Sequence, residues 1–186
     1  INELQVKDRP DVIFAESVGS SGDIVATVIK PLLTLSESPL SSISLSVFVD
    51  SMLLLAYLDG EDLPFSENIL YIFKKQIEQA QILVLNKIDL LTGDEVDRLK
   101  RLANREYPEK TLHLQNSNSE SDIEAWYALI TEKNVDPTIE SIEIDYSKYR
   151  QGETELAWLD QKVTIKAKQG NVYDGIIDLI AGIQQE

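Results

Sequence analysis

Residues 82–91 read ILVLNKIDLL, and this stretch changes character halfway along. Its first four residues are aliphatic, which is typical of a strand that is buried on both faces of a parallel sheet. Its second half presents an amide, a cation and a carboxylate at Asn86, Lys87 and Asp89. A buried strand that ends abruptly in such groups predicts an α/β sheet with ligand-binding side chains at its strand ends.

Working outward from this stretch, the chain alternates between short apolar strands and helical patterns. Helices are predicted between the strands, and several carry sequence signals for their ends. Thr92 and Glu95 have the spacing of a capping box, Ser121 is a predicted N-cap, and Gly60 should stop the helix that starts near Ser51. Pro31 should kink or break the first helix. The predicted strands are residues 11–15, 42–49, 82–86 and 111–114, and the predicted helices are residues 21–33, 51–60, 66–80, 92–107 and 121–132.

This pattern predicts an α/β fold with a mostly parallel sheet and helices on both faces. From about residue 135 the pattern changes, because residues 138–146 and 161–167 alternate between polar and apolar side chains, as half-exposed strands do. Residues 171–183 have the spacing of an amphipathic helix. We therefore expect one main domain at residues 1–134 and a C-terminal extension at residues 135–186 that packs on the same domain.

Composition excludes several classes of function. Of the 186 residues, 43% are hydrophobic, which is enough for a sizeable core. The net charge is −15, with 17 basic against 32 acidic residues, so a nucleic-acid partner is not expected. The absence of cysteine removes disulfides, thiolate nucleophiles and cysteine zinc sites. No run of eighteen apolar residues and no signal peptide is visible, so we expect a cytoplasmic protein that does not span a membrane.

Polar side chains follow each predicted strand, and parallel strands bring such positions to one edge of the sheet. Glu16 and Gly19 follow the first strand, and Asp50 follows the second. Asp89 has two acceptor oxygens that suit the adjacent N1–H and exocyclic amine of guanine, whereas adenine presents an acceptor to the same carboxylate. Asn86 can face the same base, and the aliphatic stem of Lys87 can cover a flat ring.

Each of these residues also has a purely structural interpretation. Asn86 and Asp89 could satisfy the backbone of a strand-exit turn, and the segment at residues 16–19 could be a tight turn with a solvated carboxylate. Asp50 either lies near a nucleotide or caps the following helix. His113 lies inside a predicted strand without a nearby cysteine or second histidine, so we expect it to be structural.

Two short motifs carry a resemblance to a known family. NKID at residues 86–89 matches the guanine-specificity motif Asn-Lys-x-Asp of GTPases, and ESVG at residues 16–19 is similar to the Glu-x-x-Gly signature of the CobW/HypB/UreG family. The Val49-Asp50 strand end and residues 74–91 resemble the CobW branch, the cobalamin-synthesis and metallochaperone branch of these P-loop GTPases. Residues 149–165 also resemble a stretch of CobW-like proteins, although less specifically.

The resemblance implies a role for each matching residue. Asn86, Lys87 and Asp89 would form the base pocket. Glu16 would lie near Mg²⁺ and the γ-phosphate, with water between, and would be the catalytic residue that helps to position the attacking water. Gly19 would allow its backbone to approach the γ-phosphate. A small polar residue that contacts the base would be Ser117 or its neighbour Asn116, which could equally belong to an ordinary polar loop.

The resemblance further implies a GTP-binding hydrolase that couples GTP hydrolysis to delivery of a metal or a cobalamin cofactor. Zinc, cobalt, nickel and iron all remain open as the transferred metal. A metalloprotein or a protein of the cobalamin pathway would be the client. The resemblance also allows a homodimer, because GTPases of this class often pair across their nucleotide faces.

The sequence departs from the family pattern in two places. It contains no phosphate-binding Gly-x-x-x-x-Gly-Lys-Ser/Thr loop and no Cys-x-Cys-Cys metal motif, both of which would precede Ile1. We therefore expect a piece of a longer protein, and we expect the 186-residue chain alone not to hydrolyse GTP. The alternative is a non-enzymatic α/β interaction module with a degraded nucleotide site. A nicotinamide- or flavin-binding domain is disfavoured because no Gly-x-Gly-x-x-Gly turn occurs.

Overall fold

The computed structural model describes residues 10–35, 43–132 and 141–156, together with Tyr173, Ile176, Ile177 and Ile180. The chain divides into two compact units, Ile1–Leu156 and Ala157–Glu186. The first unit contains the sheet and its helices. In the second, the four described residues are helical, which agrees with the predicted closing helix, while Val172 and Ile183 lie outside the described residues.

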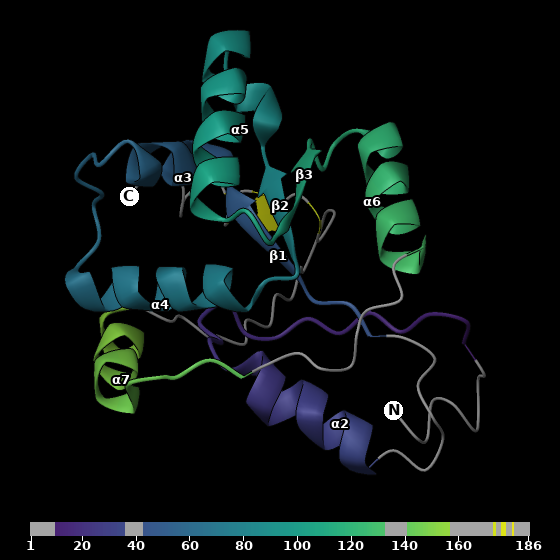
Figure 1. The fold of residues 1–186 in the computed structure, drawn as a ribbon, viewed down its shortest axis with the longest axis vertical. Coiled ribbons are helices and arrows are strands. Elements are labelled where there is room, and N and C mark those ends of the chain that lie inside the picture. Colours follow the sequence, from purple (N-terminus) through teal and green to yellow (C-terminus); the bar gives the residue numbers. More distant parts are fainter. Residues whose placement is uncertain are drawn as a thin grey trace. The chain divides into compact units, whose positions relative to one another are not determined.

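The sheet has three parallel strands in the order β1-β2-β3, with β2 in the centre (Figure 1). The strands are β1 Ser46–Asp50, β2 Ile82–Asn86 and β3 Thr111–Gln115. The four aliphatic residues of β2 are at most 1% exposed, because neighbours on both sides and helices on both faces surround them. The buried parallel strand that the sequence predicts is therefore confirmed. The last residues of the three strands, Asp50, Asn86 and Gln115, are partners in register.

Helices cover both faces of the sheet, as predicted. α3 Ser51–Leu58 and α4 Glu67–Gln79 connect β1 to β2, and α5 Gly93–Glu106 connects β2 to β3. On one face, Leu83 and Leu85 pack in a core cluster with residues of α3, α4 and α5. On the other side, α6 Glu120–Glu132 brings Trp126 against β1, where its indole N–H donates to Ser46 Oγ at 3.1 Å.

Local signals explain where most of these helices begin and end. The predicted capping box is present at α5, where Thr92 Oγ accepts from the Glu95 N–H and the Glu95 carboxylate accepts from the Thr92 N–H. Gly60 follows α3 with φ of 76°, a left-handed conformation that ends a helix readily. The predicted cap at Ser121 is wrong, because α6 already includes this residue and the Asp122 N–H donates to Ser119 Oγ instead.

The first predicted helix is present but changes its winding. Val25–Ile29 form a π-helix (η1), and α2 Lys30–Leu35 continues from it. The Lys30 N–H bonds to the Val25 carbonyl, five residues back, directly before Pro31. An α-helical turn would press the proline ring against the carbonyl four residues earlier, and the wider turn relieves this. The irregularity that the sequence predicts at Pro31 is therefore a change of helix type.

The strand predicted at residues 11–15 is wrong. This segment has no regular structure, and no described strand lies beside it to pair with its backbone. It is instead held through Phe14, whose ring centroid lies 5.7 Å from that of Trp126 and 6.4 Å from that of Tyr127. A strand needs a partner for its backbone groups, and the four apolar residues that follow Asp11 do not supply one.

The C-terminal part of the first unit also differs from prediction. Residues 141–145 form no strand, and they lead into the unpredicted helix α7 Tyr146–Glu155. The Asp145 carboxylate caps this helix by accepting from the Ser147 and Lys148 N–H groups at 2.9 and 3.3 Å. Asp145 therefore starts a helix at the end of a polar–apolar alternation that predicted a strand. Residues 133–140 and 161–167 lie outside the described residues.

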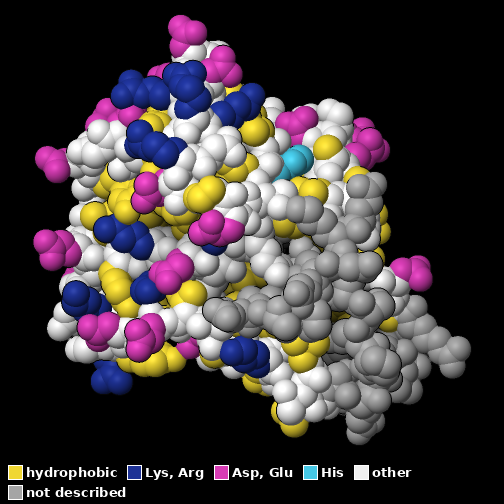
Figure 2. Space-filling view, viewed as in Figure 1, with side chains coloured by type: hydrophobic (Ala, Val, Ile, Leu, Met, Phe, Trp, Pro, Cys, Tyr) yellow, Lys and Arg dark blue, Asp and Glu magenta, His cyan; other side chains and the backbone are white. Residues whose placement is uncertain are grey.

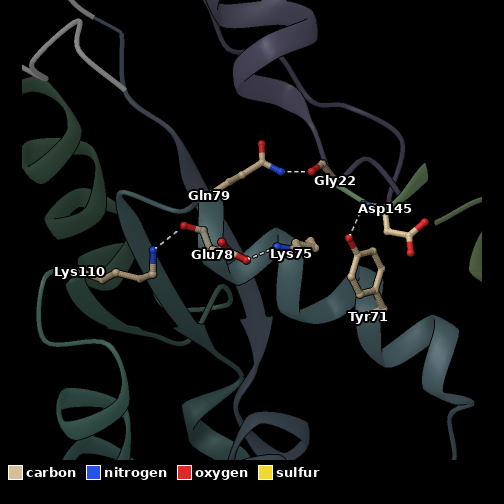
Figure 3. Close-up of polar contacts among 7 residues, drawn as sticks. All are labelled: Gly22, Tyr71, Lys75, Glu78, Gln79, Lys110 and Asp145. Carbon is tan, nitrogen blue, oxygen red and sulfur yellow. Dashed lines mark hydrogen bonds and ion pairs between the residues drawn. The ribbon is translucent and has the colours of Figure 1, made fainter. Parts of the chain in front are cut away.

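α7 packs closely on α4. A Cβ at Gly152 would lie 2.6 Å from the Asn68 carbonyl oxygen, so only glycine allows this approach. α4 also bonds to two backbone segments, at Gly22 and at Asp145 directly before α7. Figure 3 shows the Gln79 amide directed at Gly22 and the Tyr71 hydroxyl directed at Asp145, whose N–H donates to it at 2.7 Å. α4 is therefore the element on which the turn at residues 20–23 and α7 both rest.

Charges on the first unit are interspersed. On the face drawn in Figure 2, basic side chains gather at the end of the molecule where α5 lies, with acidic side chains among them. Arg98 of α5 pairs with Asp59 at 2.8 Å. Within α4, Lys75 pairs with Glu78 at 2.8 Å, and Lys110 Nζ donates to the Glu78 carbonyl at 2.8 Å (Figure 3). Burial lowers the pKa of Lys110 from its usual value.

Candidate functional site

The carboxyl ends of the three strands place a row of polar residues side by side. Asp50, Asn86 and Gln115 are the final residues of β1, β2 and β3 and are neighbours in register. The loops that follow carry Lys87 and Ser117 to the same edge, where both make side-chain contacts with this row. The predicted gathering of polar side chains at the carboxyl edge is therefore present for these strands.

Asp50 serves two neighbours at once. One carboxylate oxygen accepts from the Met52 and Leu53 N–H groups at 2.9 and 3.3 Å, so Asp50 is the N-cap of α3. Its other oxygen accepts from Lys87 Nζ at 2.9 Å. Partial burial opposes its ionisation, but the bonds from Lys87 and the two N–H groups prevail, so the pKa of Asp50 lies below its usual value. Of the two interpretations of Asp50, helix capping is confirmed.

Lys87 has an unusual backbone. Its φ is 59° and its ψ is 35°, the left-handed region, and among the described residues it is the only non-glycine with positive φ. Such conformations are unfavourable for a side chain with a Cβ and are concentrated at functional sites. The ion pair with Asp50 joins the far end of the Lys87 side chain to the end of β1.

Asn86 is engaged by a loop far away in sequence. Ser117 Oγ donates to Asn86 Oδ1 at 2.8 Å and accepts from Gln115 Nε2 at 3.0 Å. The structural interpretation requires the Asn86 side chain to bond to the backbone of its own turn, and the oxygen of this side chain instead accepts from Ser117. Its carbonyl oxygen is occupied, and within the described part of the chain its NH₂ group has no hydrogen-bond partner.

The two candidates for the small polar base contact differ in their surroundings. Asn116 is used by its own turn, because its N–H donates to Asp122 at 2.8 Å and its Oδ1 accepts from the Asn118 N–H at 2.9 Å. Hydrogen bonds from the Asn116 backbone and from Ser119 hold the pKa of Asp122 below its usual value. Ser117 is the candidate that the structure brings to Asn86.

Asp89 lies in the short 3₁₀ helix η2 Ile88–Leu90, two residues beyond Lys87. Its side chain is exposed, and no residue in the described ranges bonds to its carboxylate. The local-turn interpretation of Asp89 therefore has no contact to support it. An exposed carboxylate next to a row of fixed polar groups is available to a ligand that presents N–H donors.

Gly19 is bonded to a different part of the sheet's surroundings. The Gly19 carbonyl accepts from Gln76 Nε2 at 2.6 Å, and Gln76 is in the last turn of α4, which leads to the amino end of β2. The structure therefore does not bring Gly19 together with Asn86 and Asp89. Because residues 11–15 form no strand, nothing in the described chain directs residues 16–19 to the carboxyl edge.

The described residues provide no ready-made metal centre. They contain no cluster of three or more His, Asp or Glu side chains arranged to hold an ion. Glu16 is an exposed carboxylate, so it suits the limited role of one indirect ligand to a Mg²⁺ ion that phosphates hold. His113 lies in β3, and its Nε2 is buried without a hydrogen-bond partner among the described residues.

No helix in the described ranges has the length and apolarity needed to cross a bilayer.

Gln115 is a site residue that the sequence interpretation missed. It is 3% exposed and belongs to β3, whereas the predicted strand stopped at Leu114. The signal was available in principle, because a buried amide at the end of a strand occupies the same position as Asn86 in β2. A polar residue at a strand end indicates a site when it is the register partner of a polar residue on the next strand. The position at which the apolar run stops does not give this register.

Comparison with known proteins gives the family. The model of the CobW/HypB/UreG nucleotide-binding domain matches residues 1–113, which include both short motifs and end within β3. No curated protein and no solved structure matched the chain. The match covers more than half of the 186 residues, and the parallel α/β fold with polar strand ends agrees with it. The chain belongs to the CobW/HypB/UreG family, because the model of that family's nucleotide-binding domain matches residues 1–113.

Proposed function

We propose that the carboxyl edge of this sheet recognises the guanine base in a GTP-binding protein of metallochaperone type. Two features of this edge carry the proposal: the Asp89 carboxylate is exposed, and the carbonyl oxygen of the Asn86 amide already accepts from Ser117, which leaves its NH₂ group for a ligand. Together they offer acceptors from one side chain and donors from the other. A ligand that fits them presents donors and an acceptor in turn along one edge.

Guanine has this pattern. Its N1–H and exocyclic amine are adjacent donors that suit the two oxygens of Asp89, and its O6 and N7 are acceptors that suit the Asn86 NH₂. Adenine has an acceptor at N1 and a donor at N6, so the contacts to Asp89 and to O6 would be lost and an acceptor would face the carboxylate, whereas the N7 acceptor is common to both bases. The stem of Lys87, held by Asp50, would cover the ring face.

GTP hydrolysis and its coupling to delivery are further parts of the proposal, supported by family membership. When bound, Mg²⁺ would neutralise charge on the phosphates. Glu16 would position the attacking water by accepting a hydrogen bond from it, and the backbone of Gly19 would approach the γ-phosphate. Nucleotide binding would require residues 16–19 to leave Gln76 and order near the phosphates, and hydrolysis would reverse this.

The client of this activity would be a metalloprotein or a protein of the cobalamin pathway, in the cytoplasm. Zinc, cobalt, nickel and iron remain the candidate metals, with a homodimer as the proposed assembly. A non-enzymatic interaction module is the second candidate function. It is favoured by the hydrogen bond that the Gly19 carbonyl accepts from Gln76 of α4.

Asp89→Asn in the complete gene product tests the base contact. Asparagine replaces one acceptor by a donor, so GTP affinity should fall roughly ten- to hundredfold, whereas xanthosine triphosphate, which has a carbonyl in place of the exocyclic amine, should bind better. Calorimetry with both nucleotides measures this, and Asp94→Asn, a nearby exposed aspartate of α5, is the matched control. Unchanged GTP affinity in Asp89→Asn would contradict the assignment.

The two candidate functions are separated by the wild-type protein itself. A GTPase should bind GTP in a magnesium-dependent manner and release phosphate, whereas an interaction module should do neither. Residues 1–186 alone should bind guanine nucleotide weakly, because the phosphate-binding loop is not among them. Tight magnesium-dependent binding by this chain would mean that the phosphate site lies within it.

A further inference from the structure

Gln115 and Asn86 are linked through the hydroxyl of Ser117. Gln115 is 3% exposed and is the register partner of Asn86 on the neighbouring strand. Its Nε2 donates to Ser117 Oγ at 3.0 Å, and Ser117 Oγ donates to Asn86 Oδ1 at 2.8 Å. The three polar groups form one directed chain that ends at the base-contacting amide.

The direction of this chain has a chemical consequence. A serine hydroxyl has one hydrogen and can rotate, so alone it could either donate to the Asn86 carbonyl or accept from the Asn86 NH₂. An amide N–H pointing at the oxygen of Ser117 favours the arrangement in which the serine hydrogen goes to Asn86. The two ends of an asparagine amide have nearly the same shape, so packing alone does not choose between them.

Gln115 is a poor choice for packing alone. Its Oε1 is buried without a hydrogen-bond partner among the described residues. Burying an unpaired carbonyl is unfavourable, and methionine would fill a similar space without it. A polar residue at this position therefore calls for a polar role, and the contact with Ser117 is the one that its amide makes.

We infer that Gln115 is a positioning residue that acts through Ser117 to hold the Asn86 NH₂ toward the bound base. It would thereby set the preference for a base with an acceptor at position 6, guanine (O6) over adenine (N6–H₂). The inference rests on the proposed function of this edge. Both Gln115 and Ser117 lie beyond residues 1–113, so they are outside the part of the chain that matches the family domain.

Gln115→Glu reverses the chain and is the decisive variant. An ionised carboxylate only accepts, so Ser117 would donate to it and accept from the Asn86 NH₂, turning the Asn86 carbonyl toward the base. The ratio of GDP to ADP affinity in the complete gene product should fall roughly five- to tenfold, the effect of about one hydrogen bond. Gln115→Met, which leaves Ser117 free to rotate, should lower the ratio by a smaller factor.

The readout separates positioning from structure. Loss of structure would weaken GDP and ADP alike and leave their ratio unchanged, whereas a turned amide changes the ratio. Asn118→Ala is the matched control, because its exposed side chain makes no bond within the described residues and its backbone contact with Asn116 remains. Circular dichroism and thermal melts report folding. If Gln115→Glu does not fold, Gln115→Met and Ser117→Ala decide.

The possible outcomes are distinct. If the wild type does not prefer GDP to ADP, the proposed function fails. If it does, and the folded Gln115 variants keep the wild-type ratio, the inference about Gln115 is overturned while the proposed function stands. A lowered ratio in Gln115→Glu and Ser117→Ala, with an unchanged ratio in Asn118→Ala, supports the inference.

Discussion

Asp50→Ala should destabilise the protein, because this side chain connects three pieces of the carboxyl edge. It accepts from the Met52 and Leu53 N–H groups at the start of α3, and it pairs with Lys87 in the loop after β2. Alanine removes all three contacts. Asp50→Asn keeps an oxygen that can accept from the helix N–H groups and removes only the charge pair.

The magnitude follows from these contacts. Loss of an N-cap costs about 1 kcal/mol, within a range of about 0.5–2 kcal/mol. The ion pair adds little, because the Lys87 side chain is 56% exposed and exposed pairs contribute at most about 1 kcal/mol. We therefore expect Asp50→Ala to lower the free energy of unfolding by about 1–2 kcal/mol, and Asp50→Asn by about 0.5 kcal/mol or less.

Equilibrium unfolding in urea, followed by circular dichroism, measures both variants against the wild type. Asp62→Ala is a suitable control, because Asp62 is an exposed aspartate in the loop after α3 and bonds to no described residue. If Asp50→Asn is as destabilising as Asp50→Ala, the charge pair and not the cap stabilises this edge, and the reasoning is refuted. An Asp50→Ala variant as stable as the control would refute it equally.

Three further predictions concern stability. The pKa of Asp50 and of Asp122 is lowered in the folded protein, so their contribution is present above the unfolded pKa of about 3.9 and is lost as the pH falls through the folded values. Melting temperatures between about pH 2 and 7 should therefore drop on the acid side, and less steeply in Asp50→Asn. Gly152→Ala should lower the melting temperature although alanine favours helices, because its Cβ would meet backbone at 2.6 Å, whereas Gly93→Ala, with nothing within 4 Å, should not. Thr92→Ala should cost about 1 kcal/mol in urea unfolding by removing the cap of α5, and a cost near zero would contradict the capping box.

The elements that the sequence predicted well are those with strong local signals. The aliphatic run of β2 is buried because strands pair with both of its edges and helices cover both faces of the sheet, a position that favours consecutive apolar residues. The Thr92 capping box and the positive φ of Gly60 also depend on neighbouring residues alone. These features therefore did not require knowledge of the tertiary structure.

The elements that were missed depend on distant partners. Residues 11–15 have the composition of a strand, but strand formation needs a neighbour, and Phe14 found aromatic contacts instead. α7 lies where alternating residues suggested a strand, and its packing relies on the small size of Gly152 against α4. No local pattern contains that information.

The site divides in the same way. Asn86, Lys87 and Asp89 could be proposed from the sequence because a short motif follows directly after a strong strand signal. Gln115 was missed because its importance comes from register with β2, which joins residues 29 positions apart in the sequence. The expected position of Gly19 at the carboxyl edge depended on the strand at residues 11–15, and the Gly19 carbonyl accepts a hydrogen bond from Gln76 of α4.

The left-handed backbone of Lys87 creates a conflict at position 87 between the stability of the folded protein and the proposed contact with the base. Glycine adopts φ of 59° without the penalty of about 1 kcal/mol that a side chain with a Cβ incurs there. A library screened only for heat resistance should therefore enrich glycine or asparagine at position 87, and the same clones should lose the aliphatic stem that we propose covers the purine. Sequencing such a library, followed by nucleotide titration of the enriched clones, would reveal the conflict directly.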